Sequence, residues 1–266
     1  METKTLAIVG CGYLAEIVVD ALINGLLPNY RLIGTMSRTK EKAEHLAKKT
    51  NDVQKTHRCE AFDNTTELLA LKPNIIVETA STTALKDFAL RALENGSSLV
   101  TLSIGAFADA KFYADVQKAA LDNGAKVYIP SGAIGGFDVL QTIALMGEST
   151  ATFTTEKGPN SLYYTKAYDE KWRTEKTEVF SGNAIGAIAL LPTQVNVSVA
   201  ASLASVGPEN IQVSINSLPN YVGDEHCITM QNHEVKANLS IYSATSAIAG
   251  WSVVRTLRNI VSPIVF

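Results

Sequence analysis

A glycine-rich segment near the N-terminus directly follows the short apolar run of residues 6–9. Residues 10–15 read Gly-Cys-Gly-Tyr-Leu-Ala, which is the pattern G-x-G-x-x-A. In a strand-to-helix turn of this kind the first glycine permits the tight bend, the second lets the backbone approach a pyrophosphate, and the small third residue lets helix pack on strand. The free N–H groups of the helix would bind the phosphates. We therefore predict a dinucleotide site that includes Gly10, Gly12, Tyr13, Leu14 and Ala15.

The residues after the next apolar run, residues 31–35, bear on which dinucleotide is bound. An NAD site usually has an acidic residue there for the ribose 2′-hydroxyl, whereas a 2′-phosphate needs a cation. Residues 34–40 read Gly-Thr-Met-Ser-Arg-Thr-Lys and contain neither Asp nor Glu. Arg38 can bind a phosphate through two hydrogen bonds, and Ser37 can donate another. We predict NADP as the preferred cofactor and NAD as the alternative; the competing interpretation is a solvated basic turn.

The first half of the chain alternates short β-branched runs with stretches whose apolar residues lie three or four positions apart. Such alternation predicts βαβ units and a parallel sheet covered by helices on both faces. The predicted strands are residues 5–9, 31–35, 74–79, 98–102 and 126–129. The predicted helices are residues 14–26, 39–49, 83–94 and 108–121. We therefore expect a Rossmann dinucleotide-binding domain.

The pattern changes after about residue 136. Residues 152–156 and 210–216 alternate polar and apolar side chains, which favours antiparallel strands. Residues 163–176 are charged and predict an exposed loop, and residues 245–260 are helical in period and are expected to return to the first domain. The predicted fold is α/β, with a Rossmann domain of residues 1–136 completed by a helix within 244–266. A smaller α+β domain, residues 137–243, would bind substrate, catalyse and dimerise.

Composition excludes several classes of protein. The 266 residues are 46% hydrophobic and 18% charged, with a formal net charge of −3. We therefore expect neither nucleic acid nor a membrane surface as a partner, and no run of about 18–20 apolar residues predicts a membrane-spanning helix. Cys11, Cys59 and Cys227 are too far apart to suggest a disulfide framework or a metal site, so we predict no metal and a reducing, cytoplasmic location. The expected partners are a small-molecule substrate and further copies of the chain, as a homodimer or a larger homo-oligomer.

Several segments resemble one enzyme family. Residues 127–138, Val-Tyr-Ile-Pro-Ser-Gly-Ala-Ile-Gly-Gly-Phe-Asp, resemble a strand-to-helix junction of the L-aspartate dehydrogenase family. Residues 77–81, 102–109, 199–203, 245–246 and 255–259 resemble further segments in the same order. The resemblance implies an NAD(P)-dependent enzyme that oxidises the amine-bearing carbon of L-aspartate to an imine. Hydrolysis then gives oxaloacetate and ammonia, and the reaction can run in reverse.

Small residues and hydroxyls in these segments follow the carboxyl ends of predicted parallel strands, where open α/β sheets bind ligands. They would leave room for the nicotinamide and its ribose, and the paired glycines would let backbone N–H groups approach a substrate carboxylate. The predicted cofactor residues are Ala80, Ser81, Ser103 and Gly105. The predicted substrate residues are Ser131, Gly132, Gly135, Gly136, Asn196 and Ser198, the last standing where the family has an asparagine. The competing interpretation is that each glycine and serine serves only a turn.

The family resemblance also implies a histidine in the second domain that acts as acid and base. His226 matches it by its distance from residues 200–201 and by its position after a strand and a loop. Imidazole suits the role because its unperturbed pKa lies near neutrality. His233 is the alternative, with poorer spacing, and His45 and His57 are expected to be solvated.

The chain departs from the family pattern near this histidine, and these departures keep other functions open. Cys227 stands where an acidic residue is usual, and residues 241–244 replace an Asn-Pro element in a shortened segment. One alternative is a dehydrogenase of another small amino or hydroxy acid, although the lysine common in such enzymes is missing after the fourth and fifth predicted strands. The other is a non-catalytic NADP-binding sensor.

Overall fold

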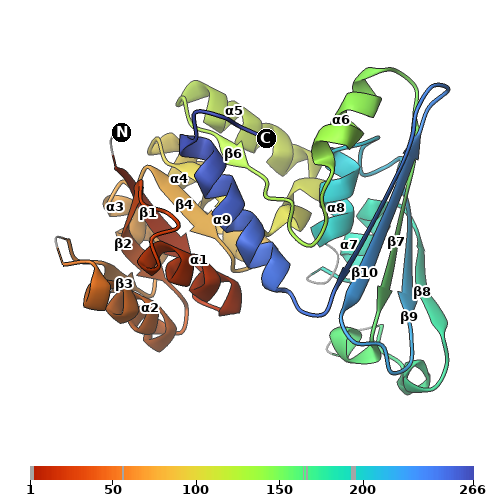
Figure 1. The fold of residues 1–266 in the computed structure, drawn as a ribbon, viewed down its shortest axis with the longest axis horizontal. Helices are drawn as coiled ribbons and strands as arrows, with labels where there is room; N and C mark the ends of the chain where they lie inside the picture. The colour runs from red at the N-terminus through yellow and green to blue at the C-terminus, as the bar shows by residue number, and fades with distance from the viewer. Residues whose placement is uncertain (1–2, 56, 164, 166, 193–195) are drawn as a thin grey trace. The chain divides into compact units, whose positions relative to one another are not determined.

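The computed structural model describes residues 3–55, 57–163, 165, 167–192 and 196–266 (Figure 1). The chain divides into two compact units, Met1–Pro130 with Ala249–Phe266, and Ser131–Ile248. These divisions lie close to the domain boundaries expected from the sequence. The C-terminal segment belongs to the first unit, so that unit is discontinuous along the chain.

The first unit is built on a six-stranded sheet in which all the strands are parallel. Its strand order is β3-β2-β1-β4-β5-β6. This is the order of a Rossmann fold, whose ligand crevice lies at the carboxyl ends of the strands where the order reverses, here between β1 and β4. The predicted fold of this part of the chain is therefore confirmed. The strands are β1 (Lys4–Val9), β2 (Tyr30–Met36), β3 (Glu60–Phe62), β4 (Ile75–Glu78), β5 (Ser98–Thr101) and β6 (Val127–Tyr128).

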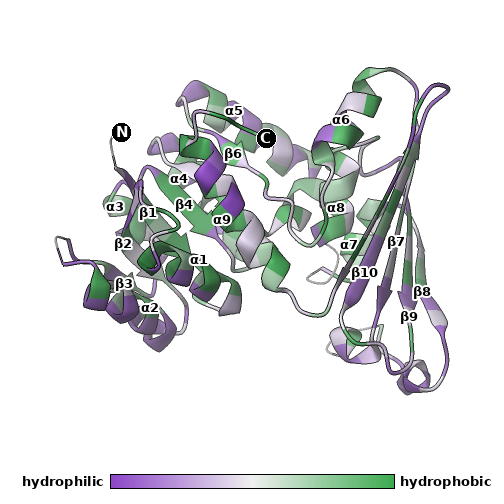
Figure 2. Ribbon diagram, in the orientation of Figure 1, coloured by the Kyte–Doolittle hydropathy of each residue, from purple (hydrophilic) through white to green (hydrophobic). Residues whose placement is uncertain are grey.

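Helices cover both faces of this sheet, as the apolar strands require. The helices α1 (Tyr13–Ile23), α2 (Lys40–Val53) and α9 (Ala247–Val261) share one apolar core with β1, β2 and β4. The helices α3 (Thr65–Ala70), α4 (Thr82–Glu94) and α5 (Ala110–Asp122) pack in sequence against one another on the other side. Figure 2 shows the consequence, hydrophobic central strands and a largely hydrophilic α2. No helix within the described ranges is both long and apolar enough to cross a bilayer.

The predicted elements of this unit are present, and their ends differ by up to a few residues. The short β3 and α3 and the 3₁₀ helix η1 (Ile104–Ala108) were not predicted. Elements of three to six residues are too short to show a period. The helices α4 and α5 end at Asn95-Gly96 and Asn123-Gly124, where Gly96 and Gly124 have φ of 82° and 61°, the left-handed conformation typical of a residue after a helix.

The second unit has a five-stranded sheet in the order β11-β10-β7-β9-β8. Its strands are β7 (Thr150–Lys157), β8 (Thr177–Gly182), β9 (Gln212–Ser217), β10 (Asp224–Gln231) and β11 (Lys236–Ser243). The expectation of antiparallel pairing is wrong for β7 and β9, which pair in parallel, whereas the other neighbours are antiparallel. The reason is the long connection between them, which contains β8 and two helices and so can cross over. This sheet and its helices make the smaller α+β unit that was expected.

Three helices complete the second unit, namely α6 (Phe137–Leu145), α7 (Ala184–Leu190) and α8 (Asn196–Leu203). The expectation that residues 163–176 form an exposed loop is wrong in part, although positions 164 and 166 lie outside the described residues. The segment contains the 3₁₀ helix η3 (Glu170–Arg173), and the ring of Trp172 is only 4% exposed. Trp172 contacts the ring of Tyr168, and both belong to the apolar core of this unit. A few aromatic side chains thus bury a segment whose overall composition is polar; the other 3₁₀ helix is η2 (Pro159–Leu162).

Candidate active site

The glycine-rich turn joins β1 to α1 and is held against the ends of two other strands. The N–H of Gly10 donates to the carbonyl of Met36 at 2.8 Å, and the Thr79 hydroxyl donates to the carbonyl of Gly10 at 2.7 Å. Gly10 has φ of 94°, and a Cβ there would lie 2.7 Å from the backbone N of Ala80. Only glycine fits this position, because a side chain would meet fixed backbone and force a strained conformation.

Gly12 has a different role, because a Cβ on it would meet no atom within 4 Å. It is the N-cap of α1 and has no side chain with which to cap the helix, so the first N–H groups of α1 face open space. Such a helix start favours a pyrophosphate. A cleft of about 600 Å³ borders this turn and offers the room that a dinucleotide needs. Six of the predicted cofactor residues line it: Gly10, Gly12, Ser37, Arg38, Ala80 and Ser81.

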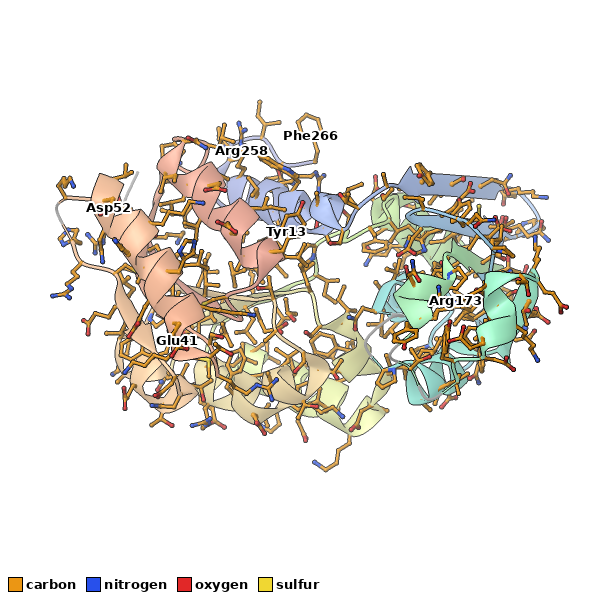
Figure 3. The ribbon with its side chains drawn as sticks, turned by 90° about the horizontal axis from the view of Figure 1, so that it is seen from below. Tyr13, Glu41, Asp52, Arg173, Arg258 and Phe266 are labelled. Atoms are coloured by element: carbon orange, nitrogen blue, oxygen red, sulfur yellow. The ribbon has the colours of Figure 1, made fainter. Side chains whose placement is uncertain are left out.

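The residues after β2 give this cleft a cationic end. Arg38 and Lys42 both line it, together with the hydroxyl residues Ser37 and Thr39. These side chains fit a 2′-phosphate through charge and hydrogen bonds. A separate hollow of about 400 Å³ is lined by Tyr13 and Glu41, which Figure 3 shows at the starts of α1 and α2.

Four predicted cofactor residues do not line either hollow. Ala15 is fully buried and packs α1 on the sheet, which is the packing role expected of the third small residue, and Leu14 is half-buried beside it. Ser103 is 5% exposed, and Gly105 lies buried in η1. Ser103 and Gly105 are therefore buried just after the end of β5. Their contact with a cofactor stays a prediction.

Glu78, the last residue of β4, accepts five hydrogen bonds although its side chain is fully buried. Its Oε1 receives the backbone N–H of Ala80 at 2.7 Å and of Ser81 at 3.1 Å, and the Ser103 hydroxyl at 2.8 Å. Its Oε2 receives the Thr101 hydroxyl at 2.5 Å and the N–H of Ser103 at 3.2 Å. Burial raises the pKa of this carboxyl above its usual value, against the opposing effect of the hydrogen bonds from Thr101, Ser103 and Ala80. Three of the five donors are backbone N–H groups, so the site suits a carboxylate that ties the loop after β4 to the loop after β5.

The predicted substrate residues begin the second unit. Gly136 is the N-cap of α6 and has φ of 72°, and a Cβ there would lie 2.5 Å from Cδ1 of Leu239. A Cβ on Gly135 would lie 3.8 Å from Cδ1 of Ile241 on β11. Gly136 therefore lets the start of α6 lie directly on β11, whereas the space beside Gly135 would accommodate a Cβ. Ser131 and Gly132 precede this turn, and Gly132 also has a left-handed conformation, with φ of 62°.

His226 lies on β10 directly opposite Ile241, so the sheet brings it close to the paired glycines. As expected, it follows a strand and a loop, namely β9 and residues 218–223, and it is the third residue of the next strand. The side chain is 2% exposed and stacks on Phe153, with ring centroids 5.8 Å apart. Burial and the nearby Lys157 ammonium lower its pKa to about 4, against the opposing effect of Asp224. The imidazole is therefore neutral at neutral pH.

The remaining predicted residues also belong to this unit. Asn196 and Ser198 lie on α8, which packs against β7, the neighbour of β10 in the sheet. The side chain of His233, by contrast, is 76% exposed in the turn after β10 and pairs with Glu234 at 3.1 Å. Exposure leaves His233 without the enclosed environment that distinguishes His226, which favours His226 as the acid/base.

Both units are similar to parts of known proteins. Residues 10–130 match the family model described as homoserine dehydrogenase, NAD binding domain, and residues 138–260 match that of the aspartate dehydrogenase C-terminal domain. The L-aspartate dehydrogenase of Methanococcus maripaludis strain C6 is 32% identical over 97% of each chain. The chain belongs to the L-aspartate dehydrogenase family. The enzyme of that name from Methanocaldococcus jannaschii is 27% identical over 97% of each chain. The crystal structure of Thermotoga maritima aspartate dehydrogenase superposes with a TM-score of 0.75 at 27% identity and full coverage of both chains.

Membership of the L-aspartate dehydrogenase family establishes an NAD(P)-dependent oxidoreductase. Two residues of this family member were missed by sequence reasoning. They are Glu78 and Lys157, which within the part of the chain that the structure describes are the only two buried residues that carry a formal charge. Glu78 stands at the end of an apolar run and could have been noticed as a charge where a buried strand should have none. Lys157 gave a weaker signal, because the strand that holds it alternates polar and apolar residues.

Proposed function

We propose that this protein catalyses the reversible oxidative deamination of L-aspartate to oxaloacetate and ammonia through iminoaspartate. The observation that carries the proposal is the similarity to L-aspartate dehydrogenases over 97% of the chain, which spans both units. The cleft beside an intact G-x-G-x-x-A turn and the enclosed neutral histidine supply the two components that the reaction needs, a dinucleotide site and a proton acceptor.

The proposed roles follow from the geometry of each unit. Gly10 and Gly12 would hold the pyrophosphate of NAD(P), which would supply the acceptor for the hydride on the amine-bearing carbon of the substrate. The N–H groups at Gly135 and Gly136 bind a carboxylate of the substrate at the start of α6. With its proton on Nε2, His226 accepts a proton at Nδ1 from the water that attacks the imine carbon, and it returns the proton to the departing amine. Nδ1 is buried and has no hydrogen-bond partner among the described residues, which leaves it available.

The proposed cofactor preference is NADP over NAD. Arg38 and Lys42 supply the charge for a 2′-phosphate, with Ser37 and Thr39 as further donors, and the segment between β2 and α2 has no carboxylate. We further propose that the protein works in the cytoplasm as a homodimer, with the second unit supplying the interface.

The test is reductive amination of oxaloacetate with ammonia, followed as the loss of absorbance of NADPH and, separately, of NADH. We expect a clear rate with NADPH and a weaker one with NADH. His226→Ala should lower kcat by about 10²–10⁴-fold while leaving the affinity for NADPH unchanged, because the imidazole moves a proton and lies in the other unit. His233→Ala is the matched control and should retain the wild-type rate.

Two results would count against this proposal. Tight NADPH binding without turnover of oxaloacetate would favour another oxo acid or a non-catalytic sensor. A higher catalytic efficiency with NADH would overturn the assignment of Arg38 and Lys42 while leaving the reaction in place.

A further inference from the structure

A group of polar side chains occupies one end of the otherwise apolar face of the second sheet. The side chain of Lys157 is 5% exposed, and its Nζ lies 2.6 Å from Oδ2 of Asp224, directly opposite on β10. Thr155 and Ser217 are 1% and 0% exposed, and they lie beside this pair on β7 and β9. His226 is directly opposite Thr155. Residues directly opposite or two apart share a face of a sheet, so these five side chains converge.

Several polar atoms of this group have no hydrogen-bond partner. Of the seven buried side-chain atoms without a partner in the described part of the chain, four belong to this group: Oγ1 of Thr155, Oγ of Ser217, Oδ1 of Asp224 and Nδ1 of His226. The ammonium of Lys157 has three N–H donors, of which Asp224 Oδ2 receives one. Buried polar atoms in folded proteins are almost always paired, so a concentration of unpaired ones indicates a place for a polar ligand or water.

The group is also poorly explained as a device for stability. A buried ion pair contributes little over an apolar replacement, and every unpaired hydroxyl destabilises the fold. Lys171, Arg173 and Lys176 of this unit have exposed side chains in ion pairs; Lys176, for example, is 63% exposed and pairs with Glu156 on the opposite face of β7. Lys157 is the cation that shares its face with His226.

We propose that Lys157, Thr155 and Ser217 bind the side-chain carboxylate of the dicarboxylic substrate, an inference that rests on the proposed function. Lys157 supplies the charge, and Thr155 and Ser217 each donate one hydrogen bond. Asp224 holds Nζ in position through its Oδ2. A carboxylate at this site would lie next to His226, so the amine-bearing carbon, which one CH₂ group separates from it, would be within reach of the proton transfer. The three residues would therefore determine the preference for an oxo acid with two carboxylates over one with a single carboxylate.

The experiment compares reductive amination of oxaloacetate with that of pyruvate, which lacks the second carboxylate. In Lys157→Met the ratio of kcat/KM for oxaloacetate to that for pyruvate should fall at least about tenfold, since the loss of a charged partner affects the dicarboxylate alone. Thr155→Val should raise the KM for oxaloacetate while the melting temperature stays unchanged or rises, because an unpaired buried hydroxyl is lost. Lys176→Met removes an exposed cation that pairs with Glu156 on β7, and it should change neither the ratio nor the KM.

The outcomes separate this inference from the function on which it rests. If the wild type aminates oxaloacetate and Lys157→Met keeps the wild-type ratio, the carboxylate site is wrong and the function stands. If the wild type does not aminate oxaloacetate, the function is wrong, and binding of succinate measured by calorimetry decides the site. Succinate binding that is lost in Lys157→Met would support the site, and equal or absent binding in both proteins would overturn it.

Discussion

At the scale of the residue, the two buried charges mark where this protein departs from an ordinary apolar core. Both carboxylate oxygens of Glu78 accept hydrogen bonds from several donors. The group around Lys157, by contrast, contains several atoms without a hydrogen-bond partner. A buried carboxylate whose hydrogen bonds are all made keeps the loops around it rigid. A buried polar group with unpaired atoms can still form hydrogen bonds with a ligand. Glu78 therefore positions the loops after β4 and β5, and Lys157 belongs to the group that we propose binds a ligand.

Glu78→Gln is expected to weaken NADPH binding about tenfold or more and to lower the stability of the first unit. An amide has one acceptor oxygen, so its NH₂ group would face a backbone N–H of Ser103 or of the Ala80–Ser81 turn. A buried donor left unpaired costs about 1–3 kcal/mol. Fluorescence titration with NADPH and thermal unfolding would measure both effects. Glu60→Gln, an exposed carboxyl on β3, is the control, and equal NADPH affinity in the two variants would contradict the positioning role of Glu78.

At the scale of the element, the close contact between a helix and a strand explains why glycine is needed at a position where the sequence alone allowed more than one role. Gly136 could serve only a turn, but the start of α6 lies so close to Leu239 of β11 that a Cβ at this position would clash. The same helix start supplies the N–H groups assigned to a carboxylate. Packing thus requires glycine at position 136, which is also one of the two positions assigned to binding.

Gly136→Ala is expected to destabilise the protein by about 1–3 kcal/mol. The alanine would hold a left-handed conformation and its Cβ would displace Leu239. Gly147→Ala is the matched comparison, since Gly147 also has a positive φ, 122°, but no atom within 4 Å of its would-be Cβ. Urea unfolding should show the larger loss for Gly136→Ala. Equal losses in the two variants would show that backbone conformation alone, and not contact with β11, requires glycine at position 136.

At the scale of the whole molecule, the first unit is assembled from both ends of the chain. Leu257 on α9 is fully buried in the core of the Rossmann sheet, and its carbonyl accepts the Tyr30 hydroxyl at 2.6 Å. Gly250 packs so closely on Ile17 of α1 that a Cβ would lie 2.8 Å from Cδ1 of that side chain. The cofactor unit is therefore complete only when the last helix has returned to it.

Leu257→Ala is expected to lower the free energy of unfolding by about 2–5 kcal/mol, because it leaves a cavity between α9 and the sheet. Saturating NADPH should restore part of this stability, since the cofactor binds the folded unit alone. Denaturant unfolding with and without NADPH tests both statements. Arg258→Ala, an exposed neighbour on the same helix, should change stability by no more than about 0.5 kcal/mol. A similarly small effect of Leu257→Ala would mean that α9 is not part of this core.

The elements that could be predicted were those with long periodic patterns and distinctive turns. The strands and helices around the G-x-G-x-x-A turn each carry apolar residues at a regular spacing, so their order and the parallel sheet follow from local sequence. The strands β10 and β11 were not assigned, although His226, Ile228 and Met230 alternate with less buried residues as strand residues do. His226 was selected by family resemblance, and its burial between Phe153 and the neighbouring strands was not visible in the sequence.

The sequence by itself determined the dinucleotide-binding turn, the Rossmann order of elements and the family, because these depend on residue types at short and regular spacing. Only the tertiary structure decided which charges are buried and what they contact. Glu78 meets Thr101 and Ser103 from the next strand, and Lys157 meets Asp224 across 67 residues of chain. Burial and pairing of a charge depend on which strands lie side by side and in which register, and sheet pairing between distant segments leaves no local pattern in the sequence.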